Sequence, residues 1–143
     1  MPDRSVLVLP ARLESLPEFM DLVRQFFVSH RFSPEKIGKI QLATEEALVN
    51  IFRYAYPEEG GPAELICRKE GEDRFLLEII DQGLPFNPLT RPDPDITVDL
   101  EHRKIGGLGI LLLKTLVEEV YYERIADRNR LTLVVHKARN PLC

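Results

Sequence analysis

The sequence predicts an α/β (α+β) fold, a two-layer sandwich in which a mostly antiparallel, mixed sheet carries three helices on one face. Two pairs of strand-like segments are joined by short turns, and short turns favour antiparallel pairing. Three further segments place apolar residues at helical spacing, enough to cover one face of a sheet. With 143 residues, the chain is expected to form a single domain over residues 1–143.

The amino-terminal part of the chain predicts a strand and then a packing helix. The run SVLVLP, residues 5–10, is typical of a short strand that its final proline closes. In SLPEFMDLVRQFFVSHRF, residues 15–32, Ser15 is expected to cap a helix. The apolar residues that recur there at helical spacing are Leu16, Phe19, Leu22, Val23, Phe26 and Phe27.

A second helix is predicted to begin at Ser33 and Pro34, because proline is tolerated in the first turn of a helix. It is expected to end near Pro57. The residues predicted to form its buried stripe are Ile37, Ile40, Ala43, Ala47 and Ile51.

The rest of the chain predicts a hairpin, a long loop, a helix and a second pair of strands. AELICRKE (63–70) and RFLLEIID (74–81) are expected to pair as antiparallel neighbours, because the GED turn between them is brief. From Gly83 to Gly109, prolines and charges predict a long loop, and loops of that length usually serve a function. LGILLLKTLVEEV (108–120) then predicts a third helix, followed by the strands VYYERI and RLTLVVHK around a turn at ADRN.

The composition argues against several classes of function. A formal net charge of −4 disfavours electrostatic binding to nucleic acid or to an anionic membrane. Cys67 and Cys143 have no metal-ligand companion at useful spacing, which indicates a reducing environment. The amino terminus lacks the apolar core of a signal peptide, and the run IGGLGILLLKTLV is too short to span a bilayer. We therefore expect a cytoplasmic protein that contacts neither membrane nor nucleic acid directly.

A polar stripe interrupts the second predicted helix. Within EEALVNIFRYAY (45–56), Glu46, Asn50 and Tyr54 recur at intervals of four residues, so that they lie along one helix face. Two interpretations fit this spacing. The stripe is either the solvated side of an amphipathic helix, or a carboxylate and a carboxamide one turn apart that form half of a metal and phosphate site.

Two more polar clusters lie at the edges of predicted elements. Asp81 directly follows a strand, and Gly83 permits a tight turn and the close approach of a flat ligand. KIGGLGI (104–110) places backbone amides without bulky side chains at the start of the third helix, which is typical of an anion site. An ordinary turn and a flexible hinge are the alternatives. The glycines match neither the dinucleotide-binding fingerprint nor the phosphate-binding loop.

Taken together, EEALVN, DQGLPFNP and KIGGLGILLLKTLVEEV support a specific resemblance. In this order and at these spacings, they resemble the motifs of the ATPase superfamily of gyrase B, heat-shock chaperones, sensor histidine kinases and MutL. Within that superfamily the chain is most similar to the anti-sigma-factor serine/threonine kinases of the general-stress and sporulation type. The resemblance covers nearly the whole chain, from LPARLESLPEF to RLTLVVHK. It implies the histidine-kinase-like ATPase (Bergerat) fold.

The resemblance also implies an ATP and Mg²⁺ site. Asn50 would coordinate Mg²⁺ between the phosphates, and Glu46 would act as the catalytic general base. Asp81 would accept a hydrogen bond from the adenine amino group, and the ATP lid would span about residues 87–106. These roles suit a reaction that depends on positioning and charge neutralisation. The implied nucleotide-binding residues are Asn50, Tyr54, Asp81, Gly83, Phe86, Gly106, Gly107 and Gly109.

Some positions leave alternatives open. Tyr54 stands where many relatives carry histidine, and both packing beside the nucleotide and a partly buried structural role fit a tyrosine. The lid residues His102, Arg103 and Lys104 are either γ-phosphate ligands or a solvated charged triplet.

The resemblance implies a partner-switching function. The chain would phosphorylate a serine of an anti-anti-sigma partner with a STAS fold, would bind a sigma factor, and would work as a homodimer. A histidine-kinase module is disfavoured, because no second domain supplies a dimerisation helix with a phosphoacceptor histidine. The alternative from another class is a non-catalytic module that binds ATP or ADP to shape a partner-binding surface. Glu46 favours the kinase, because binding alone does not require a general base.

Overall fold

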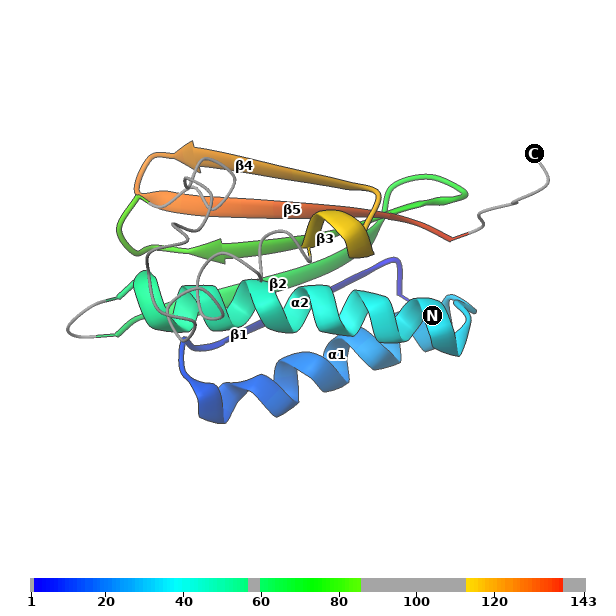
Figure 1. Cartoon of the computed structure of the whole chain (residues 1–143), viewed down its shortest axis with the longest axis horizontal. Helices are drawn as coiled ribbons and strands as arrows, with labels where there is room; N and C mark the ends of the chain where they lie inside the picture. The colour runs from blue at the N-terminus through cyan, green and yellow to red at the C-terminus, as the bar shows by residue number, and fades with distance from the viewer. Residues whose placement is uncertain (1, 57–59, 86–112, 138–143) are drawn as a thin grey trace, which may run out of the picture.

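The computed structural model describes residues 2–56, 60–85 and 113–137. They form a sheet layer and a helix layer (Figure 1). In chain order the elements are β1 (Arg4–Pro10), the 3-10 turn η1 (Leu13–Ser15), α1 (Leu16–Ser29), α2 (Pro34–Tyr54), β2 (Pro62–Lys69), β3 (Arg74–Asp81), β4 (Glu119–Ile125) and β5 (Arg128–His136). None of the described helices is long and apolar enough to cross a membrane.

The five strands form one sheet in the order β1-β2-β3-β5-β4. Each of the four pairings among the described strands is antiparallel. The β2–β3 turn closes through hydrogen bonds from the backbone N–H groups of Glu70 and Gly71 to the carbonyl of Arg74. The predicted two-layer sandwich with a mostly antiparallel sheet is confirmed. Because all four pairings are antiparallel, the described part of the sheet is not mixed, in contrast to the prediction of a mixed sheet.

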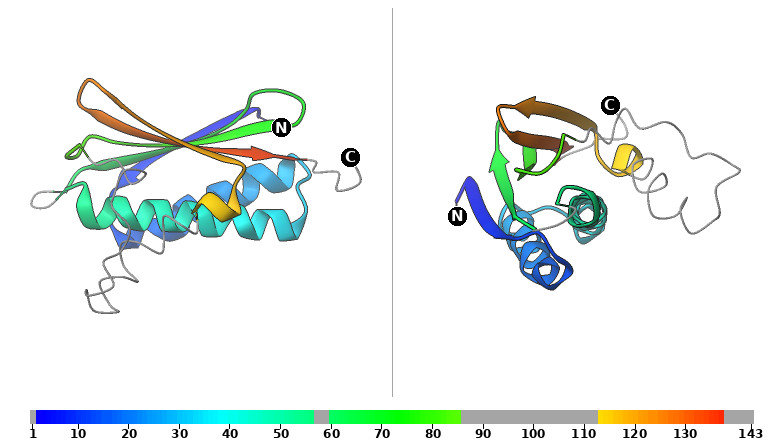
Figure 2. Two further views of the ribbon diagram at one scale, coloured as in Figure 1. Left: turned by 45° about the horizontal axis from the view of Figure 1, so that its top comes forward. Right: turned by 90° about the vertical axis from the view of Figure 1, so that its left-hand side faces the viewer.

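The core lies between the sheet and the helices, which cover one face of the sheet (Figure 2). Alternation along the strands directs one set of side chains toward α1 and α2, as in the exposed–intermediate pattern of β1. All five residues of the buried stripe predicted for the second helix are buried. Cys67 of β2 also lies in this core, and its burial raises the pKa of the thiol to about 12, so the thiol stays protonated.

The first helix is shorter than its sequence pattern predicted. Arg31 adopts φ 65°, and this left-handed residue ends the helix. The N–H of Arg31 donates to the carbonyl of Val28 (3.0 Å), and that of Phe32 donates to the carbonyl of Phe27 (3.0 Å). The two phenylalanine rings pack with centroids 4.8 Å apart. This combination of two hydrogen bonds and an apolar contact is a Schellman cap, formed here without glycine.

The two predicted helix starts have different outcomes. The side chain of Ser33 accepts a hydrogen bond from the N–H of Lys36 (3.1 Å), which confirms the predicted start of α2. The predicted Ser15 cap is wrong, because the side chain of Ser15 makes no capping hydrogen bond. Ser15 closes the preceding 3-10 turn and has φ −84° and ψ −15°. A capping side chain needs an extended backbone, which this turn does not provide.

The third predicted helix was extended too far at its carboxyl end. Its described part covers residues 113–116, and β4 begins at Glu119. The N–H of Glu118 donates to the carbonyl of Val134 on β5 (3.0 Å), so pairing with the sheet ends the helix. Leu113 and Val117 are both buried in the core. Tertiary pairing here overrides a helical sequence pattern, which is a weak local preference.

The cap at Arg31 yields a stability prediction. We expect Arg31→Gly to raise the free energy of unfolding by about 0.5–1 kcal/mol, because glycine adopts a positive φ without the steric cost of a Cβ. Arg31→Ala retains the Cβ and is the matched control, for which we expect no gain. Urea unfolding of the three proteins measures the difference. Equal stabilisation by alanine and glycine would show that loss of the arginine side chain, and not the backbone, is responsible.

Candidate functional site

Asp81 is the last residue of β3 and is 4% exposed. In the antiparallel register it lies opposite Asn129 of β5. Its Oδ1 accepts two hydrogen bonds, from the N–H of Gly83 (2.8 Å) and from Nδ2 of Asn129 (2.8 Å). Its Oδ2 accepts none from the residues that the structure describes. The predicted strand-end aspartate therefore presents one engaged oxygen and one available oxygen.

Gly83 packs directly against the carboxyl end of α2. A Cβ at this position would lie 2.2 Å from the carbonyl oxygen of Ala55, so every larger residue would clash with backbone. The next residue, Leu84, donates its N–H to that same oxygen (2.9 Å). The glycine is therefore required by the close approach of two backbones.

Tyr56 adds a second connection between the end of α2 and the turn after β3. Its hydroxyl accepts a hydrogen bond from the N–H of Gln82 (2.7 Å) and donates to the carbonyl of Pro62 (2.6 Å). The pKa of Tyr56 is raised, mainly by burial and also by the nearby charge of Asp81, against the lowering effect of the bond from Gln82. The turn is therefore held by the helix on one side and by the sheet on the other.

Burial is the main influence on the ionisation of Asp81. It raises the pKa of the carboxyl group, because the charged form loses hydration. The hydrogen bonds from Asn129 and Gly83 and the charge of Arg124 act in the opposite direction, since they favour the carboxylate. Arg124 also donates from Nη1 to the carbonyl of Gly83 (2.9 Å). A buried carboxylate with an unsaturated oxygen is suited to accept a hydrogen bond from a ligand.

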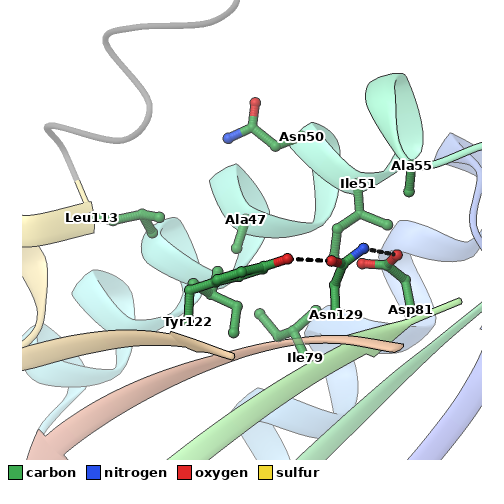
Figure 3. Close-up of a pocket in the computed structure, with 10 residues that line it drawn as sticks. Ala47, Asn50, Ile51, Ala55, Ile79, Asp81, Leu113, Tyr122 and Asn129 are labelled. Carbon is green, nitrogen blue, oxygen red and sulfur yellow. Dashed lines mark hydrogen bonds between the residues drawn. The ribbon is translucent and has the colours of Figure 1, made fainter. Parts of the chain in front are cut away.

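Asp81 and Asn50 line the same pocket between α2 and the sheet (Figure 3). Asn50 lies on α2 with its carboxamide directed away from the Asp81–Asn129 pair, and it is 5% exposed. The cavity measures about 20 Å³, room for about one water. A planar base can enter only if lining side chains move aside. The described lining is Ala47, Asn50, Ile51, Ala55, Ile79, Asp81, Leu113, Tyr122, Asn129 and Leu131.

Two members of the predicted helix stripe lie outside this lining. Glu46 is half-buried one turn before Asn50, and it makes no hydrogen bond or ion pair with any described residue. Tyr54 is half-buried in the last turn of α2. The structure thus brings Asn50 and Asp81 to one pocket, with Gly83 hydrogen-bonded to Asp81, and leaves Glu46 outside the described lining.

The remaining predicted site positions lie outside the described residues. This holds for the lid at 87–106 with its His102–Lys104 triplet, and for the four nucleotide-binding residues Phe86, Gly106, Gly107 and Gly109.

Sequence reasoning missed the residues that support Asp81 from β4 and β5. Asn129 is 4% exposed, whereas the sequence pattern predicts a turn at this position, where asparagine is common. The hydroxyl of Tyr122 donates to Oδ1 of Asn129. Asn129 is the last residue of the ADRN segment and lies near the start of a strand, so it gives no local signal that distinguishes a buried partner from a turn residue. The available signal is the strand register, which needs the sheet order.

Comparison with known proteins shows the family to which the chain belongs. The model of a family described as the histidine kinase-like ATPase domain matches residues 9–135. Serine-protein kinase RsbW of Listeria monocytogenes serovar 1/2a is 32% identical over 133 residues, which cover 86% of this chain and 82% of the relative. Serine-protein kinase RsbW of Bacillus cereus strain AH187 is 31% identical over 93 residues, which cover 62% of this chain and 58% of the relative.

A solved structure shares the fold. The crystal structure of the RsbU and RsbW domains of Rv1364c from Mycobacterium tuberculosis is similar with a TM-score of 0.70 at 16% sequence identity. The match covers 98% of this chain and 34% of that chain, so this chain spans about a third of its length. The chain therefore belongs to the histidine kinase-like ATPase domain family and, within it, to the serine-protein kinases of the RsbW type.

Proposed function

We propose that this chain transfers the γ-phosphoryl group of ATP to a serine of a partner protein. Its family consists of ATPases and serine-protein kinases, which implies the use of ATP. For this chain's own residues, the observation that carries the proposal is one pocket lined by a buried carboxylate, Asp81, and a buried carboxamide, Asn50.

The Asp81 end of the pocket suits adenine. Oδ2 of Asp81 is an acceptor without a partner among the described residues, and the exocyclic amino group of adenine is a donor. Guanine presents an oxo group at that position, which a carboxylate would repel. Most of the described lining is apolar and suits the faces of a flat ring, as at Ile51, Ile79 and Leu131.

The other end of the pocket suits magnesium and phosphate. The oxygen of the Asn50 side chain is a hard ligand of the kind that Mg²⁺ accepts alongside phosphate oxygens and water. No group of three or more His, Cys, Asp or Glu side chains able to hold a metal occurs among the described residues. A site formed by Asn50 and phosphate oxygens would not need such a group of side chains. When bound, Mg²⁺ would neutralise phosphate charge.

We assign the proton transfer of the reaction to Glu46. It lies one helical turn from Asn50 and is half-buried, so an incoming hydroxyl can reach it. We propose that its carboxylate accepts the proton of the serine hydroxyl while the serine oxygen bonds to the γ-phosphorus. The bond from the γ-phosphorus to the bridging oxygen breaks, and ADP leaves with that electron pair.

The proposal also covers the protein partners and the cellular location of the chain. We infer a serine-bearing anti-anti-sigma partner with a STAS fold, a sigma factor held inactive while that partner is phosphorylated, and a cytoplasmic location. The proposal includes one domain over residues 1–143. It also assigns the ATP lid to about residues 87–106 and phosphate binding to the backbone amides of the glycines at the end of that lid. These residues lie outside the described part of the chain. The support is family membership with serine-protein kinases.

A homodimer is part of the same proposal, and the helix-free face of the sheet is the surface we assign to it. Two apolar residues of β1, Val6 and Val8, are 40% and 54% exposed there. At the other edge of the sheet, Tyr121 and Ile125 of β4 are 50% and 52% exposed. A two-fold axis parallel to the strands would place β1 of one copy over β4 of the other, since the two edges exchange under that rotation.

The first prediction for this site concerns Asp81. We expect Asp81→Asn to weaken ATP binding by roughly ten- to a hundredfold, because an amide N–H₂ would face the adenine amino group in place of a charged acceptor. Calorimetric titration with ATP, and with GTP as a poor ligand of the wild type, measures this effect. Asp127→Asn, in the exposed β4–β5 turn, is the matched control.

The same variant tests the cost of burying the charge. Burial raises the pKa of Asp81 in the folded state, so the fold favours the protonated carboxyl group. The stabilising contribution of Asp81 is therefore present below the pKa of the unfolded state and is lost as pH rises through the pKa of the folded state. At neutral pH we therefore expect Asp81→Asn to melt at or above the temperature of the wild type, with a difference that shrinks toward acid. A variant that melts far below the wild type at neutral pH would contradict this sign.

The second prediction separates catalysis from binding. Glu46→Gln should lower phosphoryl transfer to the partner by roughly 10²–10⁴-fold while ATP binding persists, because the shape remains and the proton acceptor is lost. Asn50→Ala should reduce both binding with Mg²⁺ and transfer. Glu45→Gln, on the neighbouring residue of α2, is the matched control and should transfer normally. Radiolabelled ATP with a serine-bearing anti-anti-sigma protein provides the assay. Transfer by Glu46→Gln at the wild-type rate would instead favour a nucleotide-gated binding module.

The third prediction concerns the dimer. Val8→Glu should convert the protein to a monomer, because it would bury a charge in the interface. Val28→Glu is the matched control, since Val28 on α1 is 51% exposed on the opposite side of the molecule. Light scattering after size-exclusion chromatography measures the mass of each protein. A monomeric wild type, or a dimer that survives Val8→Glu, would remove this surface from the proposal.

A further inference from the structure

Three hydrogen bonds to described residues hold the side chain of Asn129. One hydrogen of its Nδ2 is directed to Oδ1 of Asp81 (2.8 Å) and the other to the carbonyl oxygen of Leu84 (2.8 Å). Its Oδ1 accepts from the hydroxyl of Tyr122, as Figure 3 shows. The side chain is 4% exposed. Both amide hydrogens and the amide oxygen therefore have specific protein partners in a buried site.

This set fixes the orientation of the Asn129 amide. A rotation that exchanged Nδ2 and Oδ1 would place the amide oxygen against the carboxylate of Asp81 and the carbonyl of Leu84, which are both acceptors. It would also place an N–H₂ group at the Tyr122 hydroxyl. In the observed orientation each of these three hydrogen bonds joins a donor to an acceptor, so Asn129 is a rigid donor toward Asp81.

We propose that Asn129 is the positioning residue of the adenine site: by occupying Oδ1 of Asp81 together with the N–H of Gly83, it leaves Oδ2 as the oxygen that receives the exocyclic amino group of adenine. This inference rests on the proposed ATP site. Asn129 acts through Asp81, and Tyr122 acts through Asn129. Through the hydrogen bonds Tyr122–Asn129 and Asn129–Asp81, residues of β4 and β5 thus influence which nucleotide base the site selects.

Electrostatics support the same assignment. Burial raises the pKa of Asp81, and the hydrogen bond from Asn129 is the largest influence that lowers it, ahead of Gly83 and Arg124. From the segment just after α2 the titratable neighbour is Tyr56, and from β4 the neighbours are Arg124 and, through Asn129, Tyr122. Without Asn129, the carboxyl group would hold its proton to higher pH. A protonated Asp81 is a weaker acceptor for adenine, so loss of Asn129 should impair binding most strongly on the acid side.

The experiment compares ATP affinity across pH 5 to 8 for the wild type, Asn129→Ala and Asn129→Asp. Each variant is compared with the wild type at the same pH, so that ionisation of the nucleotide cancels. We expect Asn129→Ala to bind roughly tenfold more weakly at neutral pH, as expected for a lost hydrogen bond to a charged group. The midpoint of its affinity loss toward acid should move to higher pH. A purely structural role would change the melting temperature without moving that midpoint.

Asn129→Asp provides a test with the opposite sign. With one proton shared between the two carboxyl groups, the protonated Asp side chain donates to Oδ1 of Asp81 as the amide does. With both groups ionised, the donor is lost and the charges repel. We therefore expect the affinity of this variant to approach that of the wild type as pH falls, and to decrease as pH rises toward neutrality.

Tyr122→Phe tests the hydrogen bond from Tyr122 to Asn129, and the neighbouring Tyr121 supplies the matched control. We expect it to weaken ATP binding by roughly two- to tenfold, since the Asn129 amide loses a neutral hydrogen bond that orients it. Tyr121→Phe alters the neighbouring residue, whose exposed hydroxyl donates to Glu119 on the helix-free face, and should bind ATP as the wild type does.

The outcomes distinguish this inference from the proposed function. If the wild type binds ATP, Asp81→Asn does not, and a folded Asn129→Ala binds with unchanged affinity and pH midpoint, the positioning role is overturned and the ATP site stands. If the wild type fails to bind ATP, the proposed function itself is overturned. Should Asn129→Ala fail to fold, the pH slope of Asn129→Asp and the contrast between Tyr122→Phe and Tyr121→Phe decide the question.

Discussion

The close approach of two backbones, at the carboxyl end of α2 and at the turn after β3, determines the geometry of the site. Gly83 has no room for a Cβ beside the carbonyl of Ala55, and Leu84 donates its N–H to the same oxygen. The helix that carries Glu46 and Asn50 is therefore held at a fixed distance from the strand that ends in Asp81. The separation of Asn50 and Asp81 across the pocket depends on this contact, which the hydrogen bond between Tyr56 and Gln82 reinforces.

A buried carboxylate imposes a second requirement, because removing a charge from water is costly unless hydrogen bonds replace its hydration. β5 meets this requirement for Asp81 through Asn129, and β4 contributes Tyr122 and Arg124 to the surroundings. The β4–β5 hairpin thus completes both the sheet and the site. The helix-free face of the sheet follows the same rule, since Arg68 and Arg130 pair with Glu78, which is 6% exposed.

Much of the fold could be predicted because hydrophobic periodicity reports which side of an element is buried. The predicted apolar stripe of α2 is buried throughout, and the bounds of β3 agree with the predicted segment 74–81. Predictions failed where a local pattern competed with a contact distant in sequence. The third helix ends early because Glu118 pairs with Val134, and Ser15 does not cap because a 3-10 turn precedes α1.

The sequence by itself determined the element types, the spacing of Glu46 and Asn50 on one helix face, and the Asp81-x-Gly83 turn, because these depend on residues within one or two turns of each other. Tertiary structure decided which residues surround Asp81. Asn129 lies 48 residues further along the chain and Ala55 lies on a different element, so no local pattern connects either to the turn. The strand register sets Asp81 opposite Asn129, and the packing of α2 on the sheet sets Ala55 against Gly83. Register and packing arise from the burial of the whole core, a property that no short segment of the chain contains.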